Sequence, residues 1–186
     1  MTDSRDGQSY RTVIIGEQTW MAQNLNYGTA DSYCYGDNAG NCATYGRLYT
    51  WATAVSACPA GWHLPTQQEW KTLLVAARCG LNGGSGHFLQ VATGWNCKGS
   101  GSDAYGFSAL PAGHRTIEGL FTSEGTSTYF WSATEDSSDK AYFAYLAVSY
   151  DDSHENDHSN VASGESSISK TDALSIRCLM DSSTFF

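Results

Sequence analysis

The sequence lacks any apolar stretch of about 18 residues and is poor in basic side chains. Its 186 residues include 10 Lys+Arg against 19 Asp+Glu, which gives a formal net charge of −9. The first shortage argues against a membrane-spanning helix, and residues 1–10 are too polar for a secretory signal. The second argues against nucleic acid and anionic membranes as partners, because both are bound through a basic surface.

Zinc-binding spacings are also missing, since the six cysteines contain no CxxC or CxH pair. An even set of cysteines without metal spacing is typical of disulfides in secreted or cell-surface proteins. Sequence alone does not choose among the possible pairings. We expect Cys34–Cys42, Cys79–Cys97 and Cys58–Cys178, and therefore an oxidising compartment outside the cytoplasm.

One histidine pair does fit the spacing of zinc peptidases. His154 and His158 flank Glu155 in an acidic stretch. That chemistry needs a helix to place both imidazoles on one face, whereas the flanking Ser, Asp, Asn and Gly residues favour turns. We interpret residues 149–160 as a solvated acidic loop and expect no metal site there.

Strands and helices are predicted in the first half of the chain. Residues 12–16 and 18–25 read as a hairpin that turns at Gly16-Glu17. A first helix is predicted over residues 46–58, where apolar side chains recur at helical spacing. A second helix begins with a capping box at Thr66 and Glu69. Its apolar face consists of Trp70, Leu73, Leu74 and Ala77.

The second half of the chain reads as loops followed by strands. Residues 83–125 are rich in Gly and Ser and predict long loops at the edge of a small sheet. Strands are predicted over residues 129–134, 141–150 and 173–180, the last with Leu174, Ile176, Cys178 and Met180 on one face and Ser175 and Arg177 on the other. The whole predicts one α+β domain over residues 1–186, with two helices packed on a small antiparallel sheet and long loops stapled by disulfides.

Several long stretches resemble the Fibrobacter succinogenes major paralogous domain family. They are TVIIGEQTWMAQNLNY, YGRLYTWATAVSACPAGWHLPTQQEWKTLL, YGFSALPAGHR, YFWSATE and SIRCLMD, in this order. The family in turn resembles the C-type-lectin-like fold, which is shared with formylglycine-generating enzymes and with receptor proteins of diversity-generating retroelements. The resemblance implies a C-type-lectin-like fold and a secreted or surface module. It implies no established function.

In the resembling receptor proteins, side chains on the late strands contact ligands. This implies a binding surface around residues 129–150, where tyrosine supplies a flat ring and a hydroxyl at small entropic cost. The candidate ligand-binding residues are Tyr129, Trp131, Glu135, Tyr142, Tyr145, Tyr150, His114 and Arg115. Packing within the sheet is the alternative role for each of them.

Cofactors and catalysis find little support in the sequence. The Glu-Pro-Asn, Gln-Pro-Asp and Trp-Asn-Asp patterns of calcium-binding lectins are absent, although the carboxylates at 151–157 could donate oxygens to Ca²⁺. The resembling oxidases bind copper through two cysteines close together in the C-terminal half, whereas Cys178 is the one cysteine after Cys97 in this chain. No Gly-x-Ser-x-Gly element is present. We expect no cofactor.

The resulting hypothesis is a non-catalytic ligand-binding or adhesion module, secreted or at the cell surface, that recognises a glycan or a protein. The alternative is a structural subunit that self-associates into a surface layer or fibre. An oxidase similar to formylglycine-generating enzymes is the weaker third hypothesis. A homo-oligomer is compatible with the first two.

Overall fold

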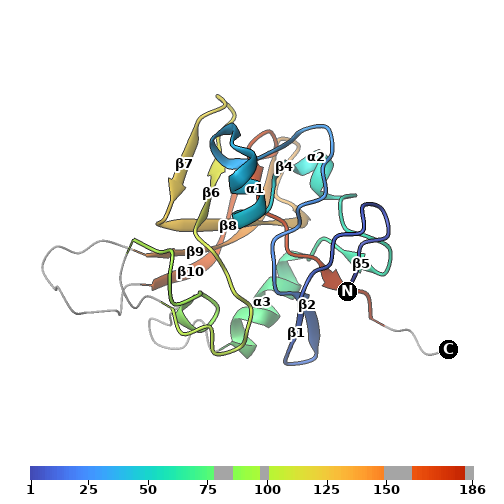
Figure 1. Cartoon of the computed structure of the whole chain (residues 1–186), viewed down its shortest axis with the longest axis vertical. Helices are drawn as coiled ribbons and strands as arrows, with labels where there is room; N and C mark the ends of the chain where they lie inside the picture. Colours follow the sequence, from blue (N-terminus) through green and yellow to red (C-terminus); the bar gives the residue numbers. More distant parts are fainter. Residues whose placement is uncertain (78–85, 97–100, 149–160, 183–186) are drawn as a thin grey trace, which may run out of the picture.

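The computed structural model describes residues 1–77, 86–96, 101–148 and 161–182, which form an α+β arrangement of two sheets and short helices (Figure 1). The strands are β1 Thr12–Ile15, β2 Gln18–Met21, β3 Ser32–Tyr33, β4 Leu48–Thr50, β5 Trp62–His63, β6 Ala112–Arg115, β7 Phe121–Glu124, β8 Ser127–Glu135, β9 Lys140–Val148, β10 Val161–Ser169, β11 Ala173–Leu174 and β12 Leu179–Met180. The helices are α1 Ala39–Tyr45, α2 Trp51–Ala54 and α3 Gln67–Ala76, with short 3-10 turns η1 Tyr35–Asp37 and η2 Gly86–Phe88. None of the helices in these ranges is long and apolar enough to cross a membrane.

The smaller sheet joins the N-terminal hairpin to the C-terminal part of the chain. Its strand order is β1-β2-β12-β5. Leu179 of β12 pairs with Trp20 on one side and with His63 on the other. Gly16, with φ 61°, makes the tight turn between β1 and β2, where a positive φ favours glycine. The predicted hairpin is therefore confirmed.

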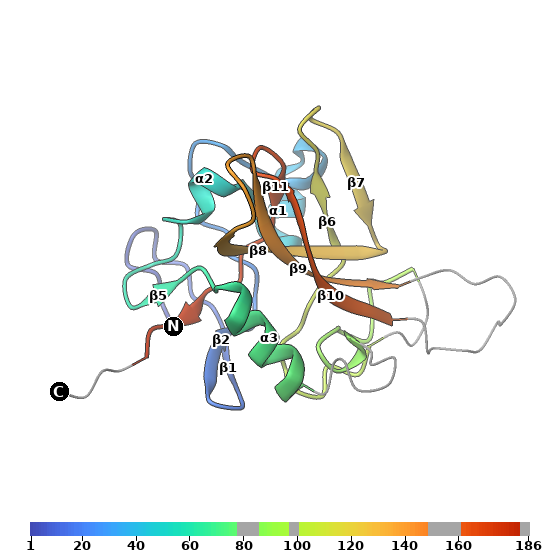
Figure 2. The same ribbon diagram turned by 180° about the vertical axis from the view of Figure 1, so that it is seen from behind.

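The larger sheet has the order β10-β9-β8-β6-β11-β4-β3, and β7 pairs with β6 outside this path. Most of its pairings are antiparallel, but β6 and β8 pair in parallel at Gly113 and Thr128. In Figure 2, α3 lies between the β1–β2 hairpin and the long strands β8, β9 and β10. Strands β6 and β7 fall inside the region predicted as loops. β10 was not predicted, because its sequence VASGESSIS has no apolar alternation.

Helix α3 forms as predicted and packs on the long strands. The Thr66 hydroxyl accepts from the Glu69 backbone N–H at 3.3 Å, and a Glu69 carboxylate oxygen accepts from the Thr66 N–H at 2.7 Å. Trp70 is buried against Trp20, with ring centroids 4.7 Å apart, and stacks on Phe130 at 5.4 Å. The cap starts the helix, and the buried tryptophan fixes it on the sheet.

The first predicted helix, over residues 46–58, is wrong. Residues Leu48–Thr50 form strand β4, and only Trp51–Ala54 is helical. Tyr49 pairs with Ser32 of β3 and with Leu174 of β11, and it is fully buried. Pairing on both sides of β4 overrides the helical spacing of its apolar residues. Consequently α3, rather than two helices, covers the long strands.

The single strand predicted over residues 173–180 is also wrong. The structure has two short strands, β11 in the larger sheet and β12 in the smaller, so residues 175–178 cross between the sheets. Both predicted faces are buried here: Ser175 and Arg177 are 0% exposed, as are Ile176 and Cys178, whereas Met180 is exposed. Alternation could not reveal this, because the segment has protein on all sides.

Two of the predicted disulfides are present. Cys34 is bonded to Cys42 with S–S 2.01 Å, and Cys58 to Cys178 with S–S 2.07 Å. The second bond ties the segment after α2 to the crossing between the two sheets. The third predicted pair, Cys79–Cys97, lies outside the described residues.

Arg177 lies in the interior and links its own segment, the crossing between the sheets, to residues 21–24 and to residues 107–108. Its Nε donates to the side-chain oxygen of Asn24 at 2.6 Å, Nη1 to the carbonyl oxygens of Met21 and Phe107, and Nη2 to that of Ser108 at 2.9 Å. Complete burial lowers the pKa of Arg177 to about 9, so the guanidinium stays charged at neutral pH.

We predict that Arg177→Met lowers the free energy of unfolding by about 3 kcal/mol or more, because it leaves several buried oxygens without donors. Urea unfolding followed by tryptophan fluorescence measures this. Arg115→Met is the control, since Arg115 is only partly buried and stacks on Tyr33, and should cost about 1 kcal/mol or less. Similar losses in the two variants would contradict a special role for Arg177.

His63 ties β5 to the start of α3 and to the segment after β12. Its Nδ1 lies 2.7 Å from a carboxylate oxygen of Asp181, and its Nε2 lies 3.1 Å from one of Glu69. Burial alone would lower the pKa of His63, but the hydrogen bonds and charges of the two carboxylates outweigh it and raise the pKa above its ordinary value. Burial alone would raise the pKa of Glu69, but hydrogen bonds from Thr66, followed by the hydrogen bond and charge of His63, outweigh it and lower the pKa.

A raised folded-state pKa means that His63 stabilises the fold below its unfolded pKa of about 6.5, and that this contribution is lost as the pH rises through the folded value. Thermal unfolding should therefore show that His63→Gln loses more stability relative to the native protein at pH 5.5 than at pH 8.5. The loss in the free energy of unfolding should be larger at pH 5.5 by up to about 1 kcal/mol, as is usual for such partly exposed pairs. Asp31→Asn, which removes an exposed carboxylate elsewhere, is the control. A stability difference between the native protein and His63→Gln that is the same at both pH values would refute the prediction.

Candidate functional site

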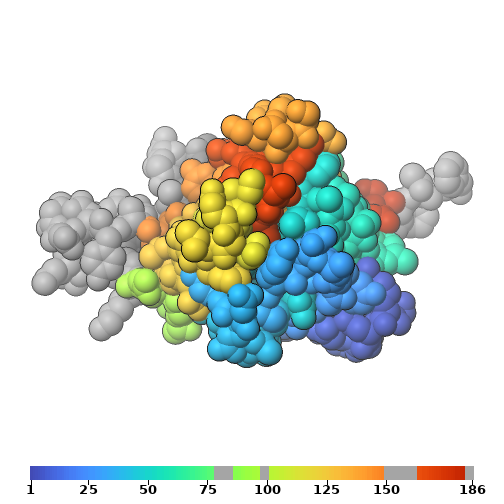
Figure 3. All heavy atoms as spheres, turned by 90° about the horizontal axis from the view of Figure 1, so that it is seen from above, coloured from blue at the N-terminus to red at the C-terminus, as the bar shows by residue number. Residues whose placement is uncertain are grey.

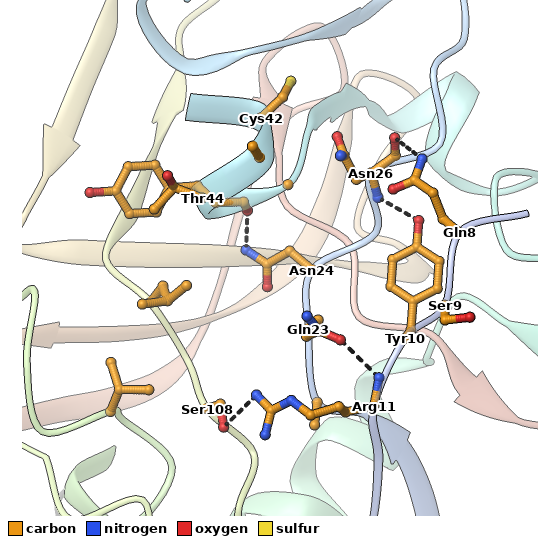
Figure 4. Close-up of a pocket in the computed structure, with 16 residues that line it drawn as sticks. Gln8, Ser9, Tyr10, Arg11, Gln23, Asn24, Asn26, Cys42, Thr44 and Ser108 are labelled. Carbon is orange, nitrogen blue, oxygen red and sulfur yellow. Dashed lines mark hydrogen bonds between the residues drawn. The ribbon is translucent and has the colours of Figure 1, made fainter. Parts of the chain in front are cut away.

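A polar cavity of about 340 Å³ opens between the N-terminal segment, the segment after β2, helix α1 and the loop before β6 (Figure 4). Its lining consists of Gln8, Ser9, Tyr10, Arg11, Ala22, Gln23, Asn24, Asn26, Cys42, Ala43, Thr44, Tyr45, Gly46, Val91, Ser108 and Leu110. Its volume lies at the lower end of the range of about 300–1,000 Å³ that is usual for small-molecule sites.

One wall is formed by Tyr10 and its neighbours. Tyr10 is buried, and its hydroxyl oxygen accepts from the backbone N–H of Asn26 at 3.1 Å. Gln8 donates through Nε2 to the carbonyl oxygen of Asn26 at 3.2 Å and to a carboxylate oxygen of Asp6 at 2.7 Å. Burial raises the pKa of Tyr10, so its hydroxyl stays protonated at neutral pH and can donate to a ligand.

The opposite wall is the C-terminal end of α1, which is pressed onto Asn24. The Nδ2 of Asn24 donates to the carbonyl oxygen of Tyr45 at 2.7 Å. Gly46 has φ 75°, and a Cβ there would lie 2.7 Å from Asn24 Cβ and 2.8 Å from Leu25 O, so only glycine fits. The Cys34–Cys42 bond anchors the same helix. This wall is held in place by side chains, backbone and a covalent bond.

The remaining side contains Arg11, Gln23 and Ser108. The Arg11 backbone N–H donates to Gln23 Oε1 at 2.8 Å, and Arg11 Nη2 donates to Ser108 Oγ at 3.3 Å. Ser108 in turn donates from its hydroxyl to Asp103 at 2.7 Å. Amides, hydroxyls and a guanidinium thus converge on one space. The lining includes no histidine or carboxylate, and its one cysteine, Cys42, is in a disulfide. This chemistry suits hydrogen bonding to a polar ligand.

The structure brings three of the predicted ligand-binding residues together outside this cavity. His114 of β6 and Tyr129 of β8 meet at 4.7 Å between ring centroids, and Tyr129 and Tyr145 reach each other through Phe143 at 5.6 and 6.2 Å. Burial lowers the pKa of His114, and its buried Nδ1 has no hydrogen-bond partner among the residues that the structure describes. We refer to His114, Tyr129, Phe143 and Tyr145 as the aromatic surface.

Arg115 points away from the aromatic surface, because successive residues of a strand face opposite sides. Its guanidinium lies 4.2 Å from the ring centroid of Tyr33 and 5.8 Å from that of Phe121. Figure 3 shows the β6–β7 hairpin, in yellow, beside the blue segment that includes α1. The ring of Tyr35 adds to the contact, 5.2 Å from Phe121.

Two further predicted residues lie apart from this group. Glu135, at the end of β8, pairs with Lys170 at 2.8 Å, and Lys170 covers the ring of Trp51. Tyr142 lies on the face of β9 opposite Phe143, where a hydrogen bond to Asp136 and the charge of that carboxylate raise its pKa. Neither joins the aromatic surface.

The assignment of Trp131 to a ligand surface is wrong. Its side chain is 0% exposed, and its Nε1 donates to the carbonyl oxygen of Tyr49 at 2.7 Å, so it packs between the strands. Tyr150 and the acidic stretch 149–160, with His154, Glu155 and His158, lie outside the described residues. Within the ranges that the structure describes, no group of three or more His, Cys, Asp or Glu residues is placed to hold a metal ion.

The cavity itself was not predicted. It joins residues 8–11 to residues 108–110, which no local pattern connects. The one usable signal is the run of amides at Gln23, Asn24 and Asn26 where a predicted strand ends, since polar groups at the start of a connecting segment often serve as ligand contacts.

Comparison with known proteins gives one result. The family model for the Fibrobacter succinogenes major domain matches residues 13–180, which include most of the cavity lining and all of the aromatic surface but not Gln8–Arg11. No curated protein and no solved structure matches the chain. Because the matched segment spans nearly the whole sequence, the protein belongs to the Fibrobacter succinogenes major domain family.

Proposed function

We propose that this protein is a non-catalytic ligand-binding or adhesion module that acts outside the cytoplasm and holds a glycan in the polar cavity. The observation that carries the proposal is the cavity itself: an open space of about 340 Å³ lined by amides, hydroxyls and a tyrosine ring. Sugars present many hydroxyl groups around an apolar ring face, and such a lining complements both.

The rigidity of the cavity supports recognition. Asn24 uses its amide on Tyr45 O and its oxygen on Arg177, so it cannot rotate without breaking both contacts. The end of α1 is fixed by Gly46 and by the Cys34–Cys42 bond. A site that is ordered before binding loses less conformational entropy when the ligand arrives.

The location outside the cytoplasm is supported by the two disulfides, which persist in oxidising compartments. We further infer that the fold is C-type-lectin-like. The pairing of the N-terminal hairpin with the C-terminal strand β12 and the long irregular connections between strands support that inference. The oxidase hypothesis gains nothing from the described cysteines, because Cys34, Cys42, Cys58 and Cys178 are all in disulfides.

The aromatic surface is the second candidate contact area. The half-buried rings of His114, Tyr129 and Tyr145 would suit a protein or glycan that stacks on them. Self-assembly is the alternative function, and one observation favours it. Strand β10 ends the larger sheet and, among the described strands, pairs with β9 alone, so its other edge is a candidate for pairing with a second copy. Light scattering over a concentration series tests assembly.

A matched pair of variants tests the cavity. Thr44 and Thr72 are both exposed helical threonines whose hydroxyls donate to the carbonyl four residues earlier, at 3.2 and 3.0 Å, but only Thr44 lines the cavity. We predict that Thr44→Trp fills the cavity and weakens binding to the best ligand on a glycan array by about tenfold or more, the equivalent of 1.4 kcal/mol. Thr72→Trp should bind as the native protein does.

The same array distinguishes the other outcomes. Loss of binding in Tyr129→Ala with full binding in Thr44→Trp would move the site to the aromatic surface. Since we expect no cofactor, binding should be the same with Ca²⁺ and with a chelator. If no glycan binds and the protein forms concentration-dependent assemblies, the proposal of a glycan module fails and self-assembly replaces it.

A further inference from the structure

The charge of the cavity is opposite to that of the protein. The chain carries a formal net charge of −9, yet Arg11 is the one charged residue among those that line the cavity. Arg11 is exposed, and its one side-chain hydrogen bond to a described residue goes to Ser108 Oγ, a neutral acceptor at 3.3 Å. It makes no ion pair within the described parts of the chain, whereas Arg5, for example, pairs with Asp3 at 2.7 Å. The guanidinium therefore retains most of its donors for a ligand.

Neighbouring groups add hydrogen-bond donors beside Arg11. The backbone N–H of Arg11 requires an acceptor, so the side-chain oxygen of Gln23 must face it, and the Gln23 NH₂ is left to donate elsewhere (Figure 4). The Tyr10 hydroxyl accepts from the Asn26 N–H and keeps its own proton for donation. Donors thus predominate where the positive charge lies.

A second positive charge lies directly behind the lining. Asn24 and Ser108 both line the cavity, and both accept hydrogen bonds from Arg177. All the hydrogen-bond acceptors of Arg177 are neutral oxygens. Arg11 and Arg177 are close enough that the charge of Arg11 contributes to lowering the pKa of Arg177, after the larger effect of burial.

Three carboxylates contact residues of the lining but do not line the cavity themselves. Asp6 is bound by Gln8, Glu124 by Tyr45, and Asp103 by Ser108. Of these, Asp103 is the one whose charge acts on Arg177. Two guanidinium groups therefore face one carboxylate at this end of the cavity, and none of the three carboxylates lines the space that a ligand would occupy.

We propose that the cavity binds an acidic saccharide, a sugar with a carboxylate of the uronic acid class, and that Arg11 pairs with this carboxylate. The proposal rests on the proposed function and names its ligand class. A saccharide fits better than an acidic peptide, because no lining residue belongs to a strand that could pair with an extended backbone. Arg11 precedes the residues matched by the family model, so the preference is assigned to this chain and not to the family.

D-glucuronate and D-glucose are the test ligands, since they differ only in a carboxylate against a CH₂OH group. Affinities are measured by NMR titration of the whole chain. The native protein should bind glucuronate about tenfold more tightly than glucose, and Arg11→Gln should remove that preference by weakening the binding of glucuronate more than that of glucose. Lys140→Gln removes the same charge at an exposed site outside the cavity and should keep the preference. Raising the salt concentration to about 1 M should weaken the preference of the native protein for glucuronate.

The outcomes separate this inference from the proposed function. Equal affinity for the two sugars, unaffected by Arg11→Gln, would overturn the acidic ligand and leave the cavity as a site for neutral glycans. An equal loss of preference in Lys140→Gln would show general charge attraction and overturn the role of Arg11. If neither sugar binds at tens of millimolar, the acidic ligand is overturned, and the glycan array decides separately whether the cavity holds a neutral glycan.

Discussion

A buried guanidinium has to find oxygen acceptors inside the protein, because an uncompensated charge there costs several kcal/mol. Arg177 meets this requirement with oxygens from two distant stretches of the chain, Met21 and Asn24 at and after the end of β2, and Phe107 and Ser108 before β6. Its guanidinium also stacks over Phe107 at 4.6 Å. Since Arg177 itself lies on the crossing between the two sheets, one side chain fixes the sheets and a long loop relative to one another.

The geometry of the candidate site depends on the hydrogen bonds of Arg177. Asn24 and Ser108 are at once the acceptors of Arg177 and part of the cavity lining, and Asn24 also holds the end of α1 through Tyr45. The arrangement helps to keep a cavity open in a region with little regular structure, because Asn24 and Ser108 are held away from it by their buried hydrogen bonds to Arg177. Any change that weakens the interior of the fold would therefore also alter the ligand site.

Local signals in the sequence predicted the elements whose causes are local. The capping box at Thr66 and Glu69 starts α3, and the Gly16 turn makes the N-terminal hairpin, because a few adjacent residues suffice for each. The apolar residues of 46–58 have helical spacing, but Tyr49 forms a strand because it pairs with Ser32 and Leu174. No local pattern reveals these two partners. Arg177 reads as the polar face of a strand until its acceptors, more than sixty residues away, are known.

The candidate site was predictable to a smaller extent. Tyrosines on the late strands were a reasonable choice, since His114, Tyr129 and Tyr145 do gather on one surface. Trp131, two residues from Tyr129 and on the same side of β8, is nevertheless buried, because its ring packs in the core and its Nε1 donates to the carbonyl oxygen of Tyr49. The cavity depends on Arg11 meeting Ser108, a contact across 97 positions that only the folded chain defines.

The two disulfides act on different properties of this structure. In the chain-entropy model, a bridge that spans 120 positions, as Cys58–Cys178 does, stabilises a fold by about 5 kcal/mol, and one that spans 8, as Cys34–Cys42 does, by about half as much. The long bridge joins the segment after α2 to the crossing that carries Arg177, so its effect is on the whole fold. The short bridge lies at the wall of the cavity, where it holds α1 against Asn24. The short bridge therefore acts mainly by fixing the position of that wall. A displaced wall would change the distances to a ligand even when the fold stays intact.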